Sequence, residues 1–494
     1  MSFIEYFICP LADAIDNTVG LIEEVYEKRD QEIESNLAGC LDFLKDELHC
    51  LIEYPYVDRI YRDSYYSYFS SKHNEYYRDC IRISLFDIKL KDSDFRSRKS
   101  IPRLEAAFRG YVIIRPTFPH IIGRTLIDPR AFKKGNFRIC QYSAAVSVNG
   151  IKLQVSGFPF SSQDGESISC AETTIWGIME YFGNKYADYQ PAAPSKIIQV
   201  LNQHSKKRLI PSAGLTVDQI SLALKEFGFG TQIYAAEDAY GLELMNIISV
   251  YIESGIPIIA ALENESTGHA VLLIGHEKDH LRHFSDASRR EIEYHYLGKV
   301  KKYIDYSDLP KRFIVNDDNL TPYRSISLSD PVEHYEPTSG FMGCTIAEIV
   351  VPLYKKVYLD VLDAKGLILQ ILVDIDFGYE LASDFVFRFF LASSRSFKYH
   401  VACLPGLPVK LKDYIVACKM PKFIWCGEFS TKGSFLNGKV AALILVDATE
   451  ANNGSMDSLI FAGYPDRCVV QLQKEFIPLP SKFRGYTKFV SNLQ

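Results

Sequence analysis

The chain has 494 residues, of which 47% are hydrophobic and 23% are charged, and its formal net charge is −6 at pH 7. This apolar content is normal for a folded protein and excludes wholesale disorder, while the length predicts about two to four domains. The negative net charge argues against a dedicated nucleic-acid-binding protein.

The start of the chain does not resemble a secretory signal, because its first basic residue is Lys28. No uninterrupted apolar run reaches the length of about 18 residues that a membrane-spanning helix needs, so we expect no membrane span. The 11 cysteines are scattered and include no Cys-x-x-Cys pair. This usage predicts mostly buried thiols in a reducing compartment, and we therefore expect a cytoplasmic protein.

Residues 1–100 are predicted to form an acidic helical region. The first fifty residues carry twelve acidic and three basic side chains. Apolar residues recur with the spacing of amphipathic helices, as in the series Leu37, Leu41, Leu44, Leu48 and Leu51. The pattern predicts two helices with acidic outer faces.

Residues 101–157 are predicted to form a basic β region. The net charge becomes positive between Arg96 and Arg138, a segment that contains eleven Lys and Arg residues and two acidic residues. Such a segment can bind nucleic acid or another anionic surface, but we favour salt bridges from Arg115, Arg124 and Arg130 to the acidic head of the chain. Further on, Asn149-Gly150 separates two alternating runs and predicts a β-hairpin.

Residues 158–350 alternate between helical and strand patterns, and residues 351–494 contain apolar runs that predict a β-rich domain. These runs are LILQILVDI, YIVACKM, KFIWCGEF and VAALILVDA. The expected fold class is therefore α+β, with a mixed central domain between an N-terminal helical and β region and a C-terminal β-rich domain.

One segment of the central region carries a chemical pattern. Ser169 with Glu172 three residues later forms a capping box, so a helix should begin at Cys170 and end near Gly183. Free N–H groups and the dipole at the start of a helix favour a thiolate. The position favours a nucleophile, and the alternative is a buried structural cysteine.

A nucleophilic thiol needs a base and a group that orients the base. His269 stands at the start of a very apolar predicted strand, about a hundred residues after Cys170. Asp317 is the first acidic residue at the end of a later predicted strand. Its neighbours Asn316 and Asp318 compete with it for the orienting role.

Residues of about 155–325 resemble the papain-like cysteine peptidase superfamily, and within it the bacteriocin-processing (double-glycine) peptidases. The likeness rests on a Gln before a Cys that opens the central helix, a Gly-His that begins a strand, and an Asp that ends the next strand. Residues Gln163, Cys170, His269 and Asp317 match that order. The resemblance implies that Cys170 is the nucleophile, His269 the base and Asp317 its orienting group. It also implies that Gln163 and the Cys170 N–H stabilise the oxyanion.

Three features depart from that family's pattern. Ala171 stands where the family usually has glycine, and the interval of seven residues between Gln163 and Cys170 is one longer than the common spacing. A charged insertion from Glu277 to Lys311 is much longer than typical. The insertion is compatible with a lid, a partner-docking element or a long loop.

The resemblance implies a thiol-dependent hydrolase that cleaves a peptide or isopeptide bond of a protein or peptide substrate through a thioester, without a cofactor. A deamidase or an acyl transferase would share the same first step. A hypothesis of another class is a non-catalytic papain-like scaffold whose flanking domains bind a protein partner. We expect no metal site, because the insertion's His280, His283 and His295 lack the spacing of ligands on one face.

Overall fold

The computed structural model describes residues 5–205, 209, 214–237, 243–278, 289–293, 300–374, 384–451, 456–472 and 475–494. The chain forms two compact units, each assembled from segments that lie far apart in the sequence. The first unit comprises Met1–Gly228, Ile259–His276 and Phe313–Val350, and the second comprises Phe229–Ile258, Glu277–Arg312 and Val351–Gln494. Helices and antiparallel sheets occur in both, which confirms the α+β class.

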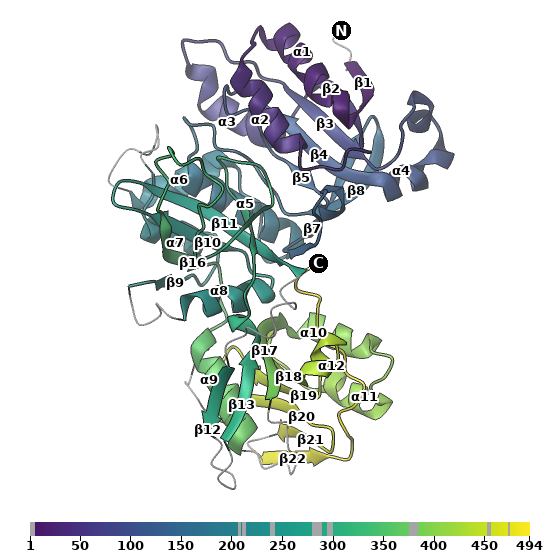
Figure 1. Ribbon diagram of the computed structural model, residues 1–494, viewed down its shortest axis with the longest axis vertical. Coiled ribbons are helices and arrows are strands. Elements are labelled where there is room, and N and C mark those ends of the chain that lie inside the picture. The colour runs from purple at the N-terminus through teal and green to yellow at the C-terminus, as the bar shows by residue number, and fades with distance from the viewer. Residues whose placement is uncertain are drawn as a thin grey trace. The chain divides into compact units, whose positions relative to one another are not determined.

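These units differ from the four consecutive regions, 1–100, 101–157, 158–350 and 351–494, that the sequence predicts. The predicted helical region and the predicted basic β region share one sheet of the order β1-β2-β3-β4-β5 (Figure 1). The predicted central region divides between both units. Backbone pairing between distant segments, which composition does not reveal, sets the real boundaries.

The N-terminal sheet is made of β1 (Glu5–Pro10), β2 (His49–Tyr56), β3 (Cys80–Phe86), β4 (Phe108–Ile114) and β5 (Leu126–Ile127). Every residue of the central strands β3 and β4 is buried. Arg82 of β3 is tolerated there because it lies opposite Glu53 of β2, with the guanidinium 2.5 Å from the carboxylate. The helices of this region are α1 (Ala14–Tyr26), α2 (Gln31–Leu41), α3 (Arg59–Ser67) and α4 (Ile101–Ala107).

Helices α1 and α2 correspond to the two predicted amphipathic helices and lie side by side (Figure 1). The Asp30 side chain caps α2 by accepting the N–H of Glu32 at 3.0 Å. The prediction that helical periodicity continues through Leu48 and Leu51 is wrong. Helix α2 ends at Leu41, and the later leucines pack around β2, because residues 49–56 pair with both β1 and β3.

The rest of the first unit contains the predicted chemical segment. Its helices are α5 (Cys170–Lys185), α6 (Pro194–His204) and α7 (Val217–Glu226). Its sheet has the order β15-β14-β11-β10-β16, with β6 beside β11. The strands are β6 (Phe137–Ile139), β10 (Ile258–Glu263), β11 (Gly268–Glu277), β14 (Phe313–Asn316), β15 (Arg324–Ile326) and β16 (Thr345–Val351). The predicted hairpin is confirmed as β7 (Tyr142–Val148) and β8 (Ile151–Gly157), with positive φ at Asn149 and Gly150.

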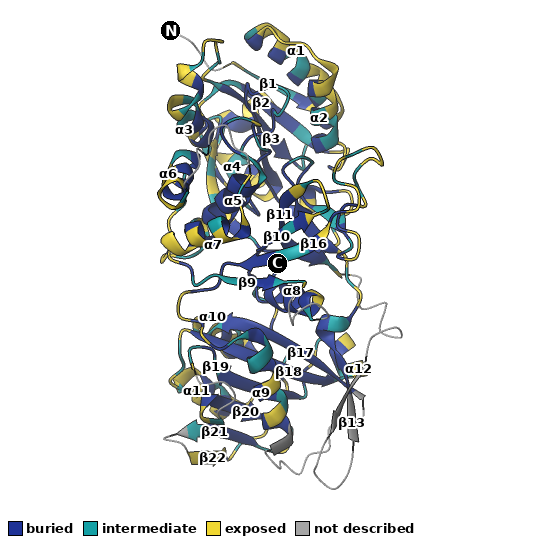
Figure 2. Ribbon diagram, turned by 90° about the vertical axis from the view of Figure 1, so that its left-hand side faces the viewer, coloured by how far each residue is buried: buried dark blue, intermediate teal, exposed yellow. Residues whose placement is uncertain are grey.

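Helix α5 begins at Cys170 as predicted, and it is buried on all sides from Ala171 to Phe182 (Figure 2). Its end differs from the prediction, since the helix continues past Gly183 to Lys185. A Cβ atom at Gly183 would lie 2.2 Å from the backbone nitrogen of Pro191. This glycine therefore permits close packing of a neighbouring loop and does not end the helix.

The second unit is built on a sheet of the order β12-β13-β17-β18-β19-β20-β21-β22. Its strands are β12 (Arg289–Glu293), β13 (Val300–Asp305), β17 (Asp384–Ser393), β18 (Phe423–Thr431), β19 (Ala442–Asp447), β20 (Leu459–Gly463), β21 (Cys468–Leu472) and β22 (Glu475–Leu479), and strand β9 (Gln232–Ala235) belongs to the same unit. Its helices are α8 (Leu244–Glu253), α9 (Val361–Asp374), α10 (Ser394–Cys403), α11 (Val409–Ala417) and α12 (Lys432–Leu436).

Helices cover both faces of this sheet. Cys426 of β18 belongs to the apolar cluster that includes residues of α10 and α11. A Cβ atom at the next residue, Gly427, would lie 2.6 Å from Ile368 of α9. Because successive strand residues point to opposite faces, α9 lies on the face opposite α10 and α11.

Two of the four apolar runs predicted as strands are helices instead. The part of LILQILVDI up to Asp374 lies in α9 and YIVACKM overlaps α11, whereas most of KFIWCGEF and VAALILVDA forms β18 and β19. The described parts of the charged insertion form β12 and β13, and β13 pairs in parallel with β17. The insertion therefore extends the sheet of the second unit, which was not among the roles expected for it. His280, His283 and His295 lie outside the described residues.

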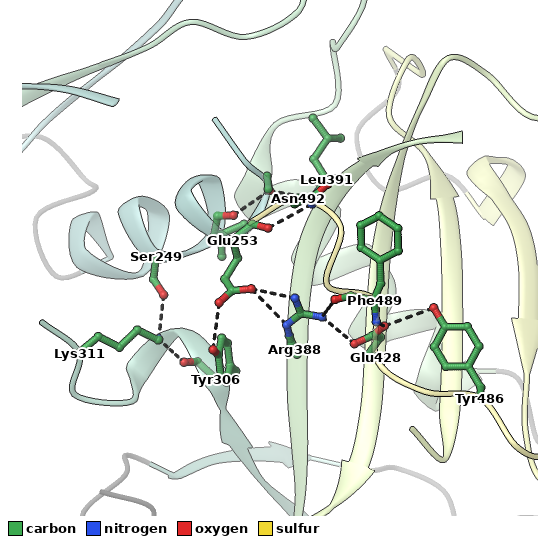
Figure 3. A network of polar contacts seen from close by, with 12 residues as sticks. Ser249, Glu253, Tyr306, Lys311, Arg388, Leu391, Glu428, Tyr486, Phe489 and Asn492 are labelled. Atoms are coloured by element: carbon green, nitrogen blue, oxygen red, sulfur yellow. Dashed lines mark hydrogen bonds and ion pairs between the residues drawn. The ribbon is translucent and has the colours of Figure 1, made fainter. Parts of the chain in front are cut away.

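A buried polar network holds the C-terminal segment to this sheet (Figure 3). The Arg388 guanidinium lies 2.8 Å from Glu253 and 2.8 Å from Glu428, and it also donates to the Phe489 carbonyl at 2.8 Å. The Asn492 amide donates to the carbonyls of Glu253 and Leu391. Because each buried charge is paired and hydrogen-bonded, we interpret the network as structural.

No helix within the described parts of the chain is long and apolar enough to cross a membrane.

Candidate active site

The loop before Cys170 is fixed by the side chain of Asp164. Its carboxylate accepts the N–H groups of Glu166 at 2.9 Å, Ser167 at 2.7 Å and Ile168 at 3.0 Å. These bonds close a tight turn immediately after Gln163. They account for the longer interval between Gln163 and Cys170, because the additional residue is part of an ordered turn.

Cys170 is the first residue of α5, where backbone N–H groups have no partner within the helix. Glu172 reaches back to accept the Ser169 N–H at 3.1 Å, as the capping box predicts. The Cys170 thiol is half-buried, in contrast to the eight fully buried cysteines of the chain. The sulfur is thus presented at the end of the helix.

His269 and Asp317 come together from two neighbouring strands of the sheet. His269 follows the first residue of β11, Asp317 follows the last residue of β14, and these strands pair in antiparallel register. The His269 Nε2 atom lies 2.8 Å from Asp317 Oδ1, and both side chains are buried. The Cys170 thiol lies close enough to the same imidazole to contribute to its raised pKa. Since Asp317 engages Nε2, Nδ1 is the ring nitrogen that remains for the thiol.

The surroundings of His269 favour its cationic form. Burial by itself lowers the pKa of the imidazole. The negative charge and the hydrogen bond of Asp317, together with the thiol of Cys170, outweigh burial and hold the pKa of His269 well above its usual value. The pKa of Asp317 is lowered despite its burial, because His269 and other donors stabilise its charge.

Two residues that the sequence analysis did not single out complete this pair. Tyr335 donates its hydroxyl hydrogen to Asp317 Oδ2 at 2.7 Å, and the Asn319 N–H donates to Asp317 Oδ1 at 3.1 Å. The Phe341 ring stacks at a tilt on the imidazole, with the ring centres 4.9 Å apart. Tyr335 and Phe341 lie on a stretch without regular periodicity, so no local pattern marks them.

The two alternatives to Asp317 occupy other positions. The Asn316 amide donates to the Pro159 carbonyl at 3.1 Å and accepts the Tyr323 N–H at 3.1 Å, which makes it a structural residue. Asp318 Oδ1 lies 3.9 Å from His269 Nε2, beyond hydrogen-bond distance. Of the three candidates, only Asp317 makes a hydrogen bond to the imidazole.

Asp318 is a buried carboxyl with an unusual environment. Neither of its oxygens has a hydrogen bond of normal geometry, although the Thr173 hydroxyl lies near enough to lower its pKa. Burial and the nearby charge of Asp317 dominate and raise the pKa of Asp318 to about 7. This carboxyl borders a cavity of about 10 Å³, which is the size of one water molecule.

Gln163 lies beside the His269 pair. Its side-chain amide donates to the Asn319 Oδ1 atom, and the Asn319 Nδ2 atom lies 3.5 Å from His269 Nε2. Asn319 therefore connects Gln163 to the His269–Asp317 pair, because it accepts from the Gln163 amide and its main-chain N–H donates to Asp317. The side chain of Gln163 is half-buried.

Cys170 and His269 open into a cleft of about 890 Å³. Its walls include the start of α7 at residues 216–220 and the end of β10 at residues 261–263. A capping box positions helix α7, in which the Gln219 N–H donates to the Thr216 hydroxyl oxygen at 3.3 Å. Ala171, the residue after the thiol, also lines this cleft and is buried.

His269, Asp317 and Asp318 also offer three potential metal-ligand atoms within 4.8 Å of one another. The contacts of His269 and Asp317 are those of a hydrogen-bonded pair. Both oxygens of Asp317 already accept hydrogen bonds from protein donors. An imidazolium, which the raised pKa of His269 favours, does not coordinate a metal. The chemistry of this cluster therefore fits acid–base work.

The basic segment is not a free cationic patch at the three arginines singled out from the sequence. Arg124 lies 2.9 Å from Asp58, which agrees with pairing to the N-terminal region. Arg130 instead pairs locally with Asp128. Arg115 donates to the main-chain carbonyls of Ser162 and Gln163, in the loop that precedes Cys170.

Comparisons with known proteins do not assign this chain to a family. No protein-family model matches the chain, and a search of curated proteins found no match to it. The roles of the site residues rest on the contacts and chemistry of the chain itself.

Proposed function

We propose that this protein is a thiol-dependent hydrolase of papain-like fold that cleaves a peptide or isopeptide bond. One observation carries the proposal: His269 lies 2.8 Å from the Asp317 carboxylate, and it lines the same cleft as the Cys170 thiol, which lies close enough to the imidazole to help raise its pKa. A thiol, a base and a group that orients the base are the three parts that acyl transfer to sulfur requires.

The first half of the reaction forms a thioester. Because the surroundings of His269 favour its cation, the imidazole already holds the proton of the Cys170 thiol when the substrate binds, and the sulfur attacks the carbonyl carbon of the substrate as a thiolate. The carbonyl oxygen becomes an oxyanion, for which the Cys170 N–H and the Gln163 amide are the proposed donors. The oxyanion then collapses, the C–N bond breaks, and the His269 imidazolium gives its proton to the leaving amine.

The second half releases the acyl group. Neutral His269 takes a proton from water, and the resulting hydroxide attacks the thioester carbon. When the C–S bond breaks, the sulfur recovers the proton and a carboxylic acid leaves. Asp317 keeps the same imidazole orientation in both halves, and its charge stabilises the imidazolium each time it forms.

The cleft supports a polypeptide substrate. A volume of about 890 Å³ lies at the upper end of the range for ligand pockets, about 300–1,000 Å³. Its wall carries apolar side chains such as Leu215, Ile220 and Leu262 next to the thiol. We also infer a reducing, cytoplasmic environment, because all 11 cysteines are free and eight of them are buried.

Labelling with iodoacetamide at neutral pH, followed by peptide mass mapping, tests the thiol. We expect Cys170 to react faster than Cys403, the exposed cysteine that serves as an internal reference. Labelling at that position should disappear in Cys170→Ala and slow strongly in His269→Ala, while the thermal midpoint of Cys170→Ala stays near that of the parent. Equal rates at Cys170 and Cys403 would contradict an activated thiol and favour the non-catalytic scaffold.

A deamidase or an acyl transferase would share the thioester and differ only in the nucleophile that resolves it. The acyl-enzyme formed with p-nitrophenyl acetate distinguishes these reactions. Release of acetate in water supports hydrolysis, whereas acetyl transfer to an added amine in preference to water supports a transferase.

A further inference from the structure

Arg115 links the N-terminal sheet to the loop that precedes the thiol. It directly follows β4, and its side chain is buried, with 5% of the residue exposed. Its guanidinium donates to the carbonyls of Ser162 at 2.7 Å and Gln163 at 2.6 Å, and to the carbonyl of His120 at 3.2 Å. It also contacts the hydroxyls of Ser161 at 3.4 Å and Ser162 at 3.3 Å.

All of these acceptors are neutral oxygens, which is unusual for a buried cation. Within the described residues, no carboxylate lies within ion-pair distance of Arg115, and the nearby charge of Asp164 offsets only part of its burial. A leucine or methionine would fill the same volume without the cost of burying a charge. Packing alone therefore does not explain why a guanidinium group, with its several N–H donors, occupies this position.

Gln163, whose main chain Arg115 contacts, also extends its side chain towards His269. The main-chain carbonyl of Gln163 accepts from Arg115, while its side-chain amide donates to Asn319 next to His269. The Asp164 turn fixes the rest of the loop up to Cys170. An amide group has two N–H donors, and the Asn319 contact engages one of them. The second remains for a substrate oxygen.

We propose that Arg115 is a positioning residue for the thiol site, which clamps the main chain of Gln163 so that its amide is pre-aligned with the oxyanion formed at Cys170. This inference rests on the proposed function, and it gives the N-terminal sheet a direct part in that function. A donor contributes to the reaction only if it stands ready where the charge develops, because reorganising it during the reaction is costly.

The test compares two reactions of the same sulfur. Iodoacetamide alkylates Cys170 by displacing iodide, and this reaction forms no oxyanion. With p-nitrophenyl acetate, the sulfur bonds to the carbonyl carbon, an oxyanion forms and collapses, and p-nitrophenolate leaves with its electron pair. Both rates are measured on the full chain at one pH, and the background from the other cysteines is subtracted with Cys170→Ala.

We expect Arg115→Lys to slow acylation about tenfold or more and to leave alkylation within about twofold, since one ammonium nitrogen cannot replace both Nη2, which donates to Ser162 and Gln163, and Nε, which donates to His120. Gln163→Ala should show the same split, and the double variant should be no slower than Gln163→Ala. Arg130→Lys is the matched control, because Arg130 is exposed and pairs only with Asp128. Both of its rates should remain unchanged.

Equal slowing of both reactions in Arg115→Lys, or no slowing of either, would overturn the positioning role. If the parent protein is alkylated at Cys170 but not acylated, the proposed hydrolase itself fails, which is a separate outcome. If Arg115→Lys does not fold, Arg115→Ala is assayed with and without millimolar guanidinium chloride. Recovery of acylation by added guanidinium supports the clamp, and folded protein that acylates at the parent rate without it contradicts the clamp.

Discussion

His269 and Asp317 are 48 residues apart in the chain, and their side chains meet with Nε2 2.8 Å from Oδ1 because β11 and β14 are antiparallel neighbours. The Asn319 N–H also donates to Oδ1 and Tyr335 donates to Oδ2, while His334 Nε2 lies 3.5 Å from Oδ2. The pair is thus buried and held by several donors, so the imidazole cannot rotate away from the Cys170 thiol without breaking charge-assisted bonds.

The first prediction concerns the charge of His269. In the parent protein its ring should lose its proton at a higher pH than an ordinary histidine, because Asp317 outweighs burial and raises the pKa well above the usual value. Asp317→Asn removes the negative charge but not the burial, so the titration should move to lower pH. NMR of isotope-labelled histidine measures both, with His269→Gln for assignment and the exposed Asp330→Asn as control. A His269 titration that is the same in the parent and Asp317→Asn would contradict this account.

The second prediction concerns Asp318 and stability. Its pKa in the folded protein is about 7, above its usual value, so the folded state binds this proton more tightly than the unfolded state. That contribution is complete below the unfolded pKa of about 4 and is lost as the pH rises towards 7. Asp318→Asn, which cannot ionise, should therefore gain stability relative to the parent as the pH rises from 5 to 8.

Thermal midpoints measured by circular dichroism at several pH values check this prediction. The difference between Asp318→Asn and the parent should grow up to about pH 7 and then level off. Asp330→Asn, which alters an exposed carboxylate, should show no such trend. A constant difference at all pH values would mean that Asp318 ionises normally.

The third prediction concerns metal. Because Asp317 is engaged by protein donors and His269 favours its cation, removal of metal should change neither the labelling of Cys170 nor the thermal midpoint. Dialysis against EDTA, with elemental analysis of the protein before and after, measures both. A stoichiometric metal that leaves together with reactivity would show that the cluster of His269, Asp317 and Asp318 binds an ion.

The fourth prediction concerns the helix that carries the thiol. Gly183→Ala places a Cβ atom 2.2 Å from the Pro191 backbone nitrogen, so it should lower the free energy of unfolding by about 1–3 kcal/mol. Gly20→Ala is the opposite control, because nothing lies within 4 Å of its Cβ position in α1. It should raise the free energy of unfolding by about 1 kcal/mol. Urea denaturation measures both variants.

Local chemistry in the sequence correctly located several parts of the site. The capping box at Ser169 predicted where α5 begins, because a cap depends on residues three positions apart. The hairpin at Asn149 followed from the positive φ that its turn demands. These features need no knowledge of distant segments.

Hydrophobic patterns led to wrong predictions where an apolar run is compatible with both a helix and a strand. The runs in α9 and α11 are buried on helices, although their composition also suits buried strands. The leucines after Leu41 keep a helical spacing, but Leu44 and Leu48 lie between α2 and β2 and Leu51 lies in β2, because pairing of this strand with two neighbours outweighs local preference.

The sequence by itself determined the start of the helix that bears Cys170 and the strand that bears His269, because capping and apolar strand patterns act over a few residues. The choice of Asp317 over Asn316 and Asp318 as the partner of the imidazole became clear from the packing of distant segments. The same packing brings Tyr335, Asn319 and Arg115 to the site. Strand register and buried hydrogen bonds join residues that are distant in the chain, and no local pattern specifies such partners.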